Sequence, residues 1–514
     1  MSQTANRIVK NTGYLYLRLG LSMFISLWTT RIVLNALGSN DFGIYNVVGG
    51  AIGMLGFLNA SMTAATQRFM NYHKGAGNME KCKEVFNASV LLHFIISLLL
   101  VVCLILLGWI FFNIILNIPE DRINAAYVVY GCLIISTAFT VMTVPYDATL
   151  NAHENMRYYA IVGVLESLLK LTVAFVVANI MVDKLIAYGI LMSSIPLIVL
   201  SIMRVYCQKN YKECQVSFTK YLKKDVMCSL TKFAGWNILA SISAMFTQYG
   251  LGILLNHFYG AILNAAQSIA NQLSGMLMAF SNSMRKAVNP VITKSEGHGD
   301  RNVAIQYAVK GSKFSYILLS FFAIPFIVEM PTMLSLWLKN VPEWAVLFCC
   351  LQLVRSLIEQ LTVGLLSLLR AHGDIKGLSL MRSMLHALTF IFTTFAFIRG
   401  SSPYWMYIFW ILIWSLGSCM VILYLSKHIL GVRVKSYILE VIVPCILISI
   451  VPVLLLCLIS ELPISPYLKV ISEISIYIIS FILLLRWIVL TTDERSVIHH
   501  KYLKFKKFLY ESVH

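Results

Sequence analysis

Four basic side chains lie in long apolar stretches of the sequence, where a membrane would offer them no water: Arg18, Arg31, Lys170 and Arg355. A charged residue at the centre of a membrane helix costs roughly 2.5–3.5 kcal/mol on insertion scales, so each should face a polar cavity or a partner. Arginine stays charged at any depth and binds phosphate oxygens through two hydrogen bonds. These four residues are therefore candidates to bind a substrate that carries anionic groups.

Arg18 and Arg31 have no acidic residue within four positions. In a helix they would be separated by nearly 20 Å along the axis and about 60° around it. They could therefore line one cavity at two depths. The alternative is that they extend toward the lipid headgroups, and this fits Arg31 better than Arg18.

Three carboxylates share these apolar stretches: Asp147, Glu166 and Glu359. Glu166 with Lys170, and Arg355 with Glu359, are four residues apart, so each pair can meet on one helix face. Either these pairs neutralise themselves and hold helices together, or their cations bind substrate. The three acids are also candidates to take up a coupling proton or sodium ion.

Composition indicates a membrane protein with many spans. The 514 residues are 58% hydrophobic and only 12% charged, with a mean hydropathy of +0.76, and so few charges could not cover a soluble fold of this size. The formal net charge is +18. Because the basic residues gather in short connections, we expect them to face anionic lipid headgroups rather than nucleic acid.

No pattern of catalytic or metal-binding residues is present. The eleven cysteines occur singly or as the neighbours Cys349 and Cys350, without the spacing of zinc ligands. No phosphate-binding glycine loop of an ATPase occurs. We therefore expect no metal, no cofactor and no enzymatic activity. His153 and His372 are interpreted as ordinary residues of helix junctions, with pH sensing as the alternative.

Apolar windows of about 20 residues predict an all-α protein with about fourteen transmembrane helices. The predicted spans are 13–36, 44–69, 85–112, 124–148, 157–181, 184–206, 230–256, 261–284, 311–337, 342–369, 377–398, 403–426, 437–460 and 466–490. Lysine and arginine are concentrated in the connections 70–84, 207–228 and 285–310 and in both terminal segments. By the positive-inside rule this side is cytoplasmic and holds both termini.

The chain contains an internal duplication with an offset of about 220 residues. Lys10-Asn11-Thr12-Gly13-Tyr14 returns as Lys232-Phe233-Ala234-Gly235-Trp236, Gly75-Ala76-Gly77 as Gly297-His298-Gly299, and Ala152-His153 as Ala371-His372. Each copy holds six spans, an even number, so the copies form a parallel repeat of the kind found in transporters.

The predicted division of the chain follows from this repeat. It is a first lobe at 1–206, a basic connection at 207–229, a second lobe at 230–428, two further spans at 429–490 and a basic tail at 491–514.

Two stretches resemble a known family. One runs from Arg31 through Asn35 and Leu37-Gly38 to Phe42-Gly43 and Tyr45. The other is Pro145-Tyr146-Asp147-Ala148 followed by Ala152-His153-Glu154-Asn155-Met156. Together with two six-helix lobes and two extra spans, these resemble the Wzx-type O-antigen and capsule repeat-unit flippases of the MOP superfamily. That superfamily also includes lipid II flippases and MATE efflux antiporters.

The resemblance implies that an undecaprenyl-diphosphate-linked oligosaccharide moves outward across the bacterial inner membrane by alternating access. Arg18 and Arg31 match the cationic first helix typical of such flippases, and Lys170 and Arg355 match only by charge and position. The implied partners are this polyprenyl-diphosphate-linked glycan, membrane lipids, a polysaccharide polymerase and glycosyltransferases. Two alternatives stay open, a MATE-like antiporter of small organic cations and a scaffold for polysaccharide assembly. An acidic interior would favour the antiporter.

Overall fold

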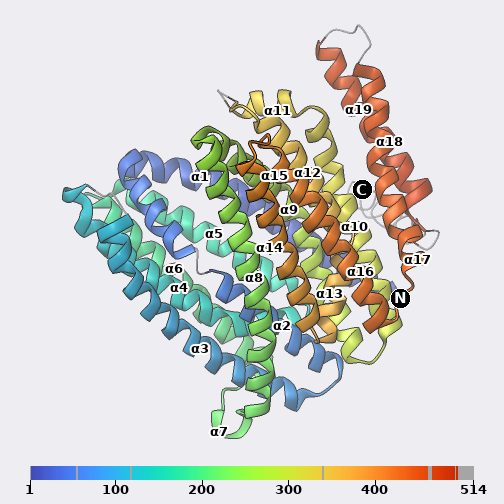
Figure 1. Ribbon diagram of the computed structural model, residues 1–514. Coiled ribbons are helices and arrows are strands. Elements are labelled where there is room, and N and C mark those ends of the chain that lie inside the picture. Colours follow the sequence, from blue (N-terminus) through green and yellow to red (C-terminus); the bar gives the residue numbers. More distant parts are fainter. Residues whose placement is uncertain are drawn as a thin grey trace, which may run out of the picture.

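The computed structural model describes residues 2–53, 56–115, 119–338, 341–460, 466–491 and 494–495, and the regular elements among them are all helices (Figure 1). The first half of the chain forms α1 (Ser2–Gly53), α2 (Gly56–Gly75), α3 (Met79–Ile110), α4 (Ile123–Ala152), α5 (Met156–Asn179) and α6 (Lys184–Asn210). The short helix α7 (Phe218–Tyr221) lies in the connection to the second half.

The second half forms α8 (Lys224–Tyr259), α9 (Ala261–Gly297), α10 (Arg301–Val328), α11 (Met330–Trp337), α12 (Ala345–Gln360), α13 (Val363–His372), α14 (Lys376–Ile398), α15 (Trp405–Phe409) and α16 (Gly417–Leu430). The chain closes with α17 (Val434–Tyr437), α18 (Val443–Ser460) and α19 (Pro466–Leu484). Wider π-helical turns occur at Phe111–Ile115, Trp410–Leu416, Ile438–Ile442 and Leu485–Val489.

All fourteen predicted spans fall on helices. By length and apolarity, ten helices in the described part could each cross a membrane, and the pair α12–α13, bent by 47°, makes eleven. The other three predicted spans lie on the end of α1 with α2, on α9, and on α19 with its π-helical extension. α9 is less apolar than those ten helices, because it includes Gln267, Asn271, Gln272, Arg285 and Lys286.

The predicted duplication has a counterpart in the backbone. α1 is interrupted at Gly38, where φ is 77° and ψ is 170°. Gly260, which has the same offset from Gly38 as Gly297 has from Gly75, separates α8 from α9 with φ 84° and ψ −178°. Gly77 and Gly299 also both have positive φ. Glycine adopts this conformation without a steric penalty, so the two copies turn at matching glycines.

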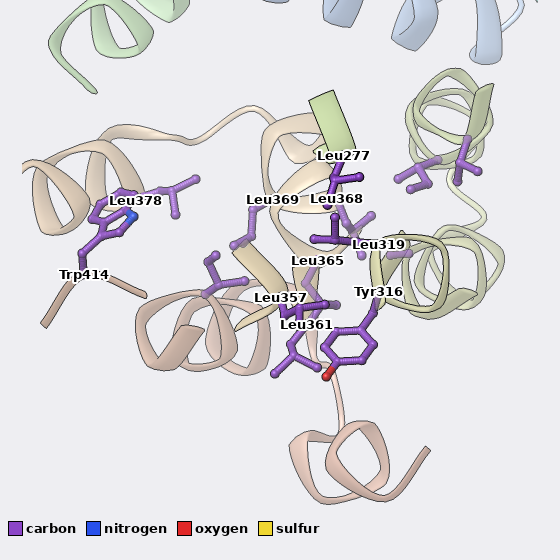
Figure 2. Close-up of a cluster of buried hydrophobic side chains, with 14 of the residues drawn as sticks. Leu277, Tyr316, Leu319, Leu357, Leu361, Leu365, Leu368, Leu369, Leu378 and Trp414 are labelled. Carbon is purple, nitrogen blue, oxygen red and sulfur yellow. The ribbon is translucent and has the colours of Figure 1, made fainter. Parts of the chain in front are cut away.

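Helices pack closely within each half, and the largest buried apolar cluster includes residues of both halves, such as Phe86 and Leu353. In the first half α1 packs on α5, and α4 packs between α3 and α6. In the second half α9 packs on α10 and α12, and α8 packs on α14. Figure 2 shows the part of this cluster in the second half, where Leu357, Leu361 and Leu365 surround the bend between α12 and α13 beside Tyr316 and Leu319 of α10.

The C-terminal helices stand at the edge of the bundle beside α10 (Figure 1). Lys313 on α10 is buried and donates to the carboxylate of Glu494 at 2.6 Å. The Tyr477 hydroxyl on α19 donates to the carbonyl oxygens of Ser320 and Phe321, at 3.1 and 2.9 Å. Because an unpaired charge in this position would be costly, Lys313 and Glu494 tie the pair α18–α19 to the second half.

The two halves pack together through α2, which contacts both α8 and α9, and their ion pairs lie at one end of the bundle, which we call the basic end. It carries the connections 76–78, 153–155, 211–223, 298–300 and 373–375. Here α2 crosses α9 so closely that a Cβ atom at Gly75 would collide with the backbone of Lys294, and one at Gly297 with the backbone of Tyr72. The repeated glycines therefore permit a close approach between the halves.

Polar contacts reinforce this crossing. Arg68 on α2 donates to the carbonyl oxygens of Ala371 (3.1 Å) and His372 (2.9 Å) at the end of α13. Glu154, after α4, forms ion pairs of 2.5 Å with Lys294 on α9 and with Arg7 on α1. Within the described residues, no hydrogen bond or ion pair joins 17–53 of α1 to the second half. The ion pairs between the halves thus lie at the basic end, while Ser61 on α2 and Ser241 on α8 lie 3.3 Å apart farther along the bundle.

Candidate functional site

Arg18 and a lysine of the other half contact the same aromatic ring. The Arg18 guanidinium lies 4.4 Å from the ring centroid of Tyr159 on α5, and Lys286 Nζ on α9 lies 3.5 Å from it. Gly163, one turn further along α5, makes room for Arg18, because a Cβ atom there would collide with the guanidinium. α1, α5 and α9 therefore bring two cations from both halves to one place.

Acidic residues accompany these two cations. Asp147 on α4 is half-buried and is acted on by the charges of Lys286, Arg18 and Glu166. Glu166 also accepts a hydrogen bond of 2.6 Å from Lys170, one turn along α5. The expected pair of Glu166 and Lys170 therefore forms. We refer to Arg18, Asp147, Tyr159, Glu166 and Lys286 as the first cluster.

The second expected pair also forms. Arg355 Nη1 lies 3.3 Å from the Glu359 carboxylate, and its guanidinium lies 4.2 Å from the ring centroid of Trp410. Glu359 in addition accepts from Trp414 Nε1 at 2.9 Å. Arg355 is thus partly neutralised by its own helix and held against an aromatic face.

An arginine near this pair was missed from the sequence. Arg382 on α14 lies 4.8 Å from the ring centroid of Trp414 and donates from Nε to Ser418 Oγ at 3.1 Å. Arg382 is half-buried.

The expectation that Arg285 and Lys286 belong to a basic connection at 285–310 is wrong. α9 continues through them to Gly297, and the connection is only 298–300. Their charge suggested a loop, although a helix that faces a polar interior need not be apolar. The repeat contained a usable signal, because at the offset of Gly75 to Gly297 the counterparts of these residues are Thr63 and Ala64, inside a predicted span.

Arg31 lies apart from the first cluster. It is exposed on α1, whereas Arg18 is half-buried, and it forms no ion pair with any residue that the structure describes. Of the seven residues expected to act on substrate or ion, the structure groups Arg18, Asp147, Glu166 and Lys170 in the first half. It groups Arg355 and Glu359 in the second.

The two repeated histidines occupy matching ion networks at the basic end. His153 Nε2 lies 2.5 Å from Glu213 Oε1 and 2.9 Å from Lys74 Nζ. His372 Nδ1 lies 3.2 Å from Glu296 and 3.1 Å from Arg301. Lys74 and Glu296 are themselves related by the repeat offset. Each histidine lies at a helix junction and also bridges two charged side chains there.

Glu213 is almost fully buried in the connection between the halves. Burial alone raises the pKa of Glu213, but the hydrogen bond with His153 and the charge of Lys74 outweigh it and lower that pKa to about 2. In the described part of the chain, no three His, Cys, Asp or Glu side chains gather as a metal site.

Comparison with known proteins identifies the family of the chain and solved structures with a similar fold. The family model described as polysaccharide biosynthesis protein matches residues 8–296. No curated protein sequence matches the chain. Among solved structures, a MATE protein in complex with MaD3S has a TM-score of 0.71 at 12% identity, with 84% of this chain and 97% of that chain covered.

Two further structures extend this likeness. An outward-facing multidrug resistance MATE transporter of the MOP superfamily has a TM-score of 0.69 at 12% identity, covering 84% of this chain and 96% of that one. A MOP-superfamily transporter from Pyrococcus furiosus, described by the reverse polarity of its binding pocket, has a TM-score of 0.67 at 12% identity and the same coverage.

Proposed function

The chain belongs to the polysaccharide biosynthesis protein family and has the fold of MOP-superfamily transporters, and from this premise we propose that it is a flippase for lipid-linked oligosaccharides. Its substrate is a polyprenyl-diphosphate-linked repeat unit of O-antigen, capsule or exopolysaccharide. It moves this molecule from the cytoplasmic to the periplasmic leaflet of the bacterial inner membrane. The basic end is cytoplasmic, and both termini lie on that side.

The observation that carries this proposal is the meeting of Arg18 and Lys286 over Tyr159. The two cations come from opposite halves, so both can contact one anionic group while it passes between them. A diphosphate offers oxygens to both, and a guanidinium binds such oxygens in pairs. The tyrosine ring holds the cations in position by cation–π contact until the substrate arrives.

Alternating access follows from the contacts at the basic end. The Glu154–Lys294 ion pair and the Arg68 hydrogen bonds hold the halves together there. These contacts must break for the substrate to enter from the cytoplasmic leaflet, and they re-form once it faces outward. The polyprenyl tail stays in lipid, because only the polar portion requires a polar path.

Acidic residues beside the cations provide a means of ion coupling. Asp147 competes with the substrate for Arg18 and Lys286, because all three charges interact. Uptake of a proton or a sodium ion by Asp147 frees the cations for the diphosphate. Glu166 and Glu359 do the same for Lys170 and Arg355, which they pair with directly.

A MATE-like antiporter of organic cations is the competing function. It requires carboxylates without cationic partners, whereas Glu166 and Glu359 each pair with a cation and Asp147 lies near two. A scaffold without transport activity gives no reason for half-buried cations between the halves. The polarity of the interior therefore favours an anionic substrate.

Complementation of a strain that lacks its own repeat-unit flippase tests the proposal. Arg18→Ala should abolish surface polysaccharide without changing protein level or membrane insertion. The matched control is Arg157→Ala, an exposed arginine two residues from Tyr159 on the same helix, and it should complement fully. Normal polysaccharide with Arg18→Ala would refute the role of Arg18.

A further inference from the structure

A cavity of about 690 Å³ lies where the chain leaves α16 and enters α17, at the edge of the bundle (Figure 1). Lys427, Arg433 and Lys435 line it together with Ser436 and Leu439. We call this cavity the α16–α17 pocket. α14 starts at the basic end and the chain returns through α16, so the pocket also lies at the basic end. It shares no residue with the site described above.

The local fold brings two helix ends together around this pocket. α16 ends at Gly431, which has φ 72° and ψ 22°, a conformation that glycine adopts without a steric penalty. The Gly431 N–H donates to the Lys427 carbonyl oxygen at 3.2 Å, and the Val432 N–H donates to that of Ser426 at 3.1 Å. These bonds close the end of α16, so its last turn and the start of α17 both contribute to the wall of the pocket.

The pocket carries three positive charges. Within the described residues, Lys427, Arg433 and Lys435 form no ion pair. The only acidic residue in the sequence 427–443 is Glu440. Its carboxylate accepts a hydrogen bond of 2.6 Å from Ser436 and does not line the pocket. Because like charges repel one another, binding of an anion in the pocket is favoured.

The pocket lies at the depth where a membrane has its headgroups. Two helices that could cross a membrane, Trp405–Leu430 and Val434–Leu456, end at it. Basic side chains at the ends of membrane helices lie at the level of the lipid headgroups. Leu439 is exposed and lies about 9 Å beyond Arg433 along the helix, toward the membrane interior. The pocket therefore combines positive charge at headgroup level with an apolar wall deeper in the membrane.

We propose that the α16–α17 pocket binds the phosphate group of an anionic phospholipid from the surrounding bilayer. The Arg433 guanidinium can bind two phosphate oxygens, and the two lysines add point charges. Basic pockets at the cytoplasmic ends of membrane helices bind anionic headgroups in this way. The exposed Leu439 contacts the acyl chains of the same lipid, which a soluble phosphate lacks. The inference is independent of the transported substrate, because this ligand belongs to the bilayer around the protein.

A lipid in this pocket connects the second half to the C-terminal helices. Lys427 belongs to α16, whereas Lys435 belongs to α17. Beside the pocket, the buried Tyr437 donates from its hydroxyl to the Leu361 carbonyl oxygen, in the bend between α12 and α13, at 2.7 Å. The start of the C-terminal helices is thus already fixed to the second half, and the lipid adds a contact at the same place. Binding should therefore raise the unfolding temperature.

Thermal unfolding of the purified full-length protein in detergent measures this binding. Wild type should be stabilised by added phosphatidylglycerol and much less by the zwitterionic phosphatidylcholine. Arg433→Gln with Lys435→Gln should weaken the apparent affinity for phosphatidylglycerol at least about tenfold. The matched control is Lys209→Gln with Lys212→Gln, because these two lysines are also exposed at the basic end but lie outside the pocket. The control should bind the lipid as wild type does.

Two results of this comparison would overturn the inference. One is equal affinity of wild type and the variant Arg433→Gln with Lys435→Gln. The other is an equal loss in the control, because phosphatidylglycerol would then be attracted by the whole basic surface rather than bound in the pocket.

A charge-preserving variant and a soluble anion complete the test. Arg433→Lys with Lys435→Arg keeps both positive charges and should retain most of the affinity for phosphatidylglycerol. A loss as large as that of the glutamine variant would assign the effect to altered folding and contradict the site. Inorganic phosphate should stabilise wild type far less than phosphatidylglycerol does. Equal stabilisation by the two would assign the pocket to free phosphate and overturn the lipid as its ligand.

Discussion

Glu154, at the turn between α4 and α5, and Lys294, near the end of α9, form an ion pair of 2.5 Å that joins the two halves of the chain. The Glu154 side chain is 1% exposed and the Lys294 side chain 20%. Glu154 has φ 55°, and its counterpart by the offset of the Ala-His pairs is Gly373, with φ 107°. The two copies thus form the same turn with different contacts. The Glu154 carboxylate pairs with Lys294, whereas Gly373 leaves room for the Arg68 side chain.

A double-mutant cycle tests whether this ion pair holds the closed end. Lys294→Gln leaves the Glu154 carboxylate buried with only Arg7 as a cationic partner. It should therefore destabilise the protein more than Glu154→Gln combined with Lys294→Gln. The coupling free energy should be roughly 1–3 kcal/mol, from unfolding temperatures in detergent. Additive effects of the two substitutions would show that the pair contributes nothing.

Gly163→Ala should impair transport without altering any charged residue. The added methyl group collides with the Arg18 guanidinium, so Arg18 must leave the face of Tyr159. Surface polysaccharide in the complemented strain should fall at least about tenfold. Gly131→Ala on α4 is the control, because nothing lies within 4 Å of its added Cβ atom. Equal loss in both variants would point to helix flexibility instead.

Acid should weaken the network around Glu213. The pKa of this carboxyl is lowered in the folded protein, from 4.5 to about 2. Its stabilising contribution is therefore complete above pH 4.5 and is lost as the pH falls from there toward 2. At neutral pH this contribution is on the order of 3 kcal/mol.

Glu213→Gln is the test of this network. The variant should unfold at a lower temperature than wild type at pH 7, and the difference should shrink as the pH approaches 3. Lys212→Gln changes the neighbouring exposed lysine and serves as the control. A difference between Glu213→Gln and wild type that does not depend on pH would assign the effect to packing rather than to charge.

Apolarity predicted the helices well because a membrane leaves few alternatives to a helix. The turns at Gly38 and Gly260 agree with the repeat, since glycine at both positions allows positive φ. The i,i+4 spacing of Glu166 with Lys170 and of Arg355 with Glu359 correctly predicted contact, because both partners lie on one helix.

Contacts between different helices could not be predicted from residue spacing along a single helix. Nothing within the sequence near Lys286 indicates that it reaches Tyr159, 127 positions earlier. The charges of Arg285 and Lys286 suggested a connection, since basic residues mark cytoplasmic loops. Arg382 gave no signal either, because its contact with Trp414 depends on how α14 packs against the π-helical turn Trp410–Leu416.

The central claim is that cations from both halves carry an anionic lipid-linked sugar between them. Its most direct test is transport of a fluorescent polyprenyl-diphosphate oligosaccharide in proteoliposomes, measured by access of a membrane-impermeant quencher. Wild type should move the lipid, and Arg18→Ala with Lys286→Ala should slow it at least about 100-fold. Transport by the double variant at the wild-type rate would contradict the claim.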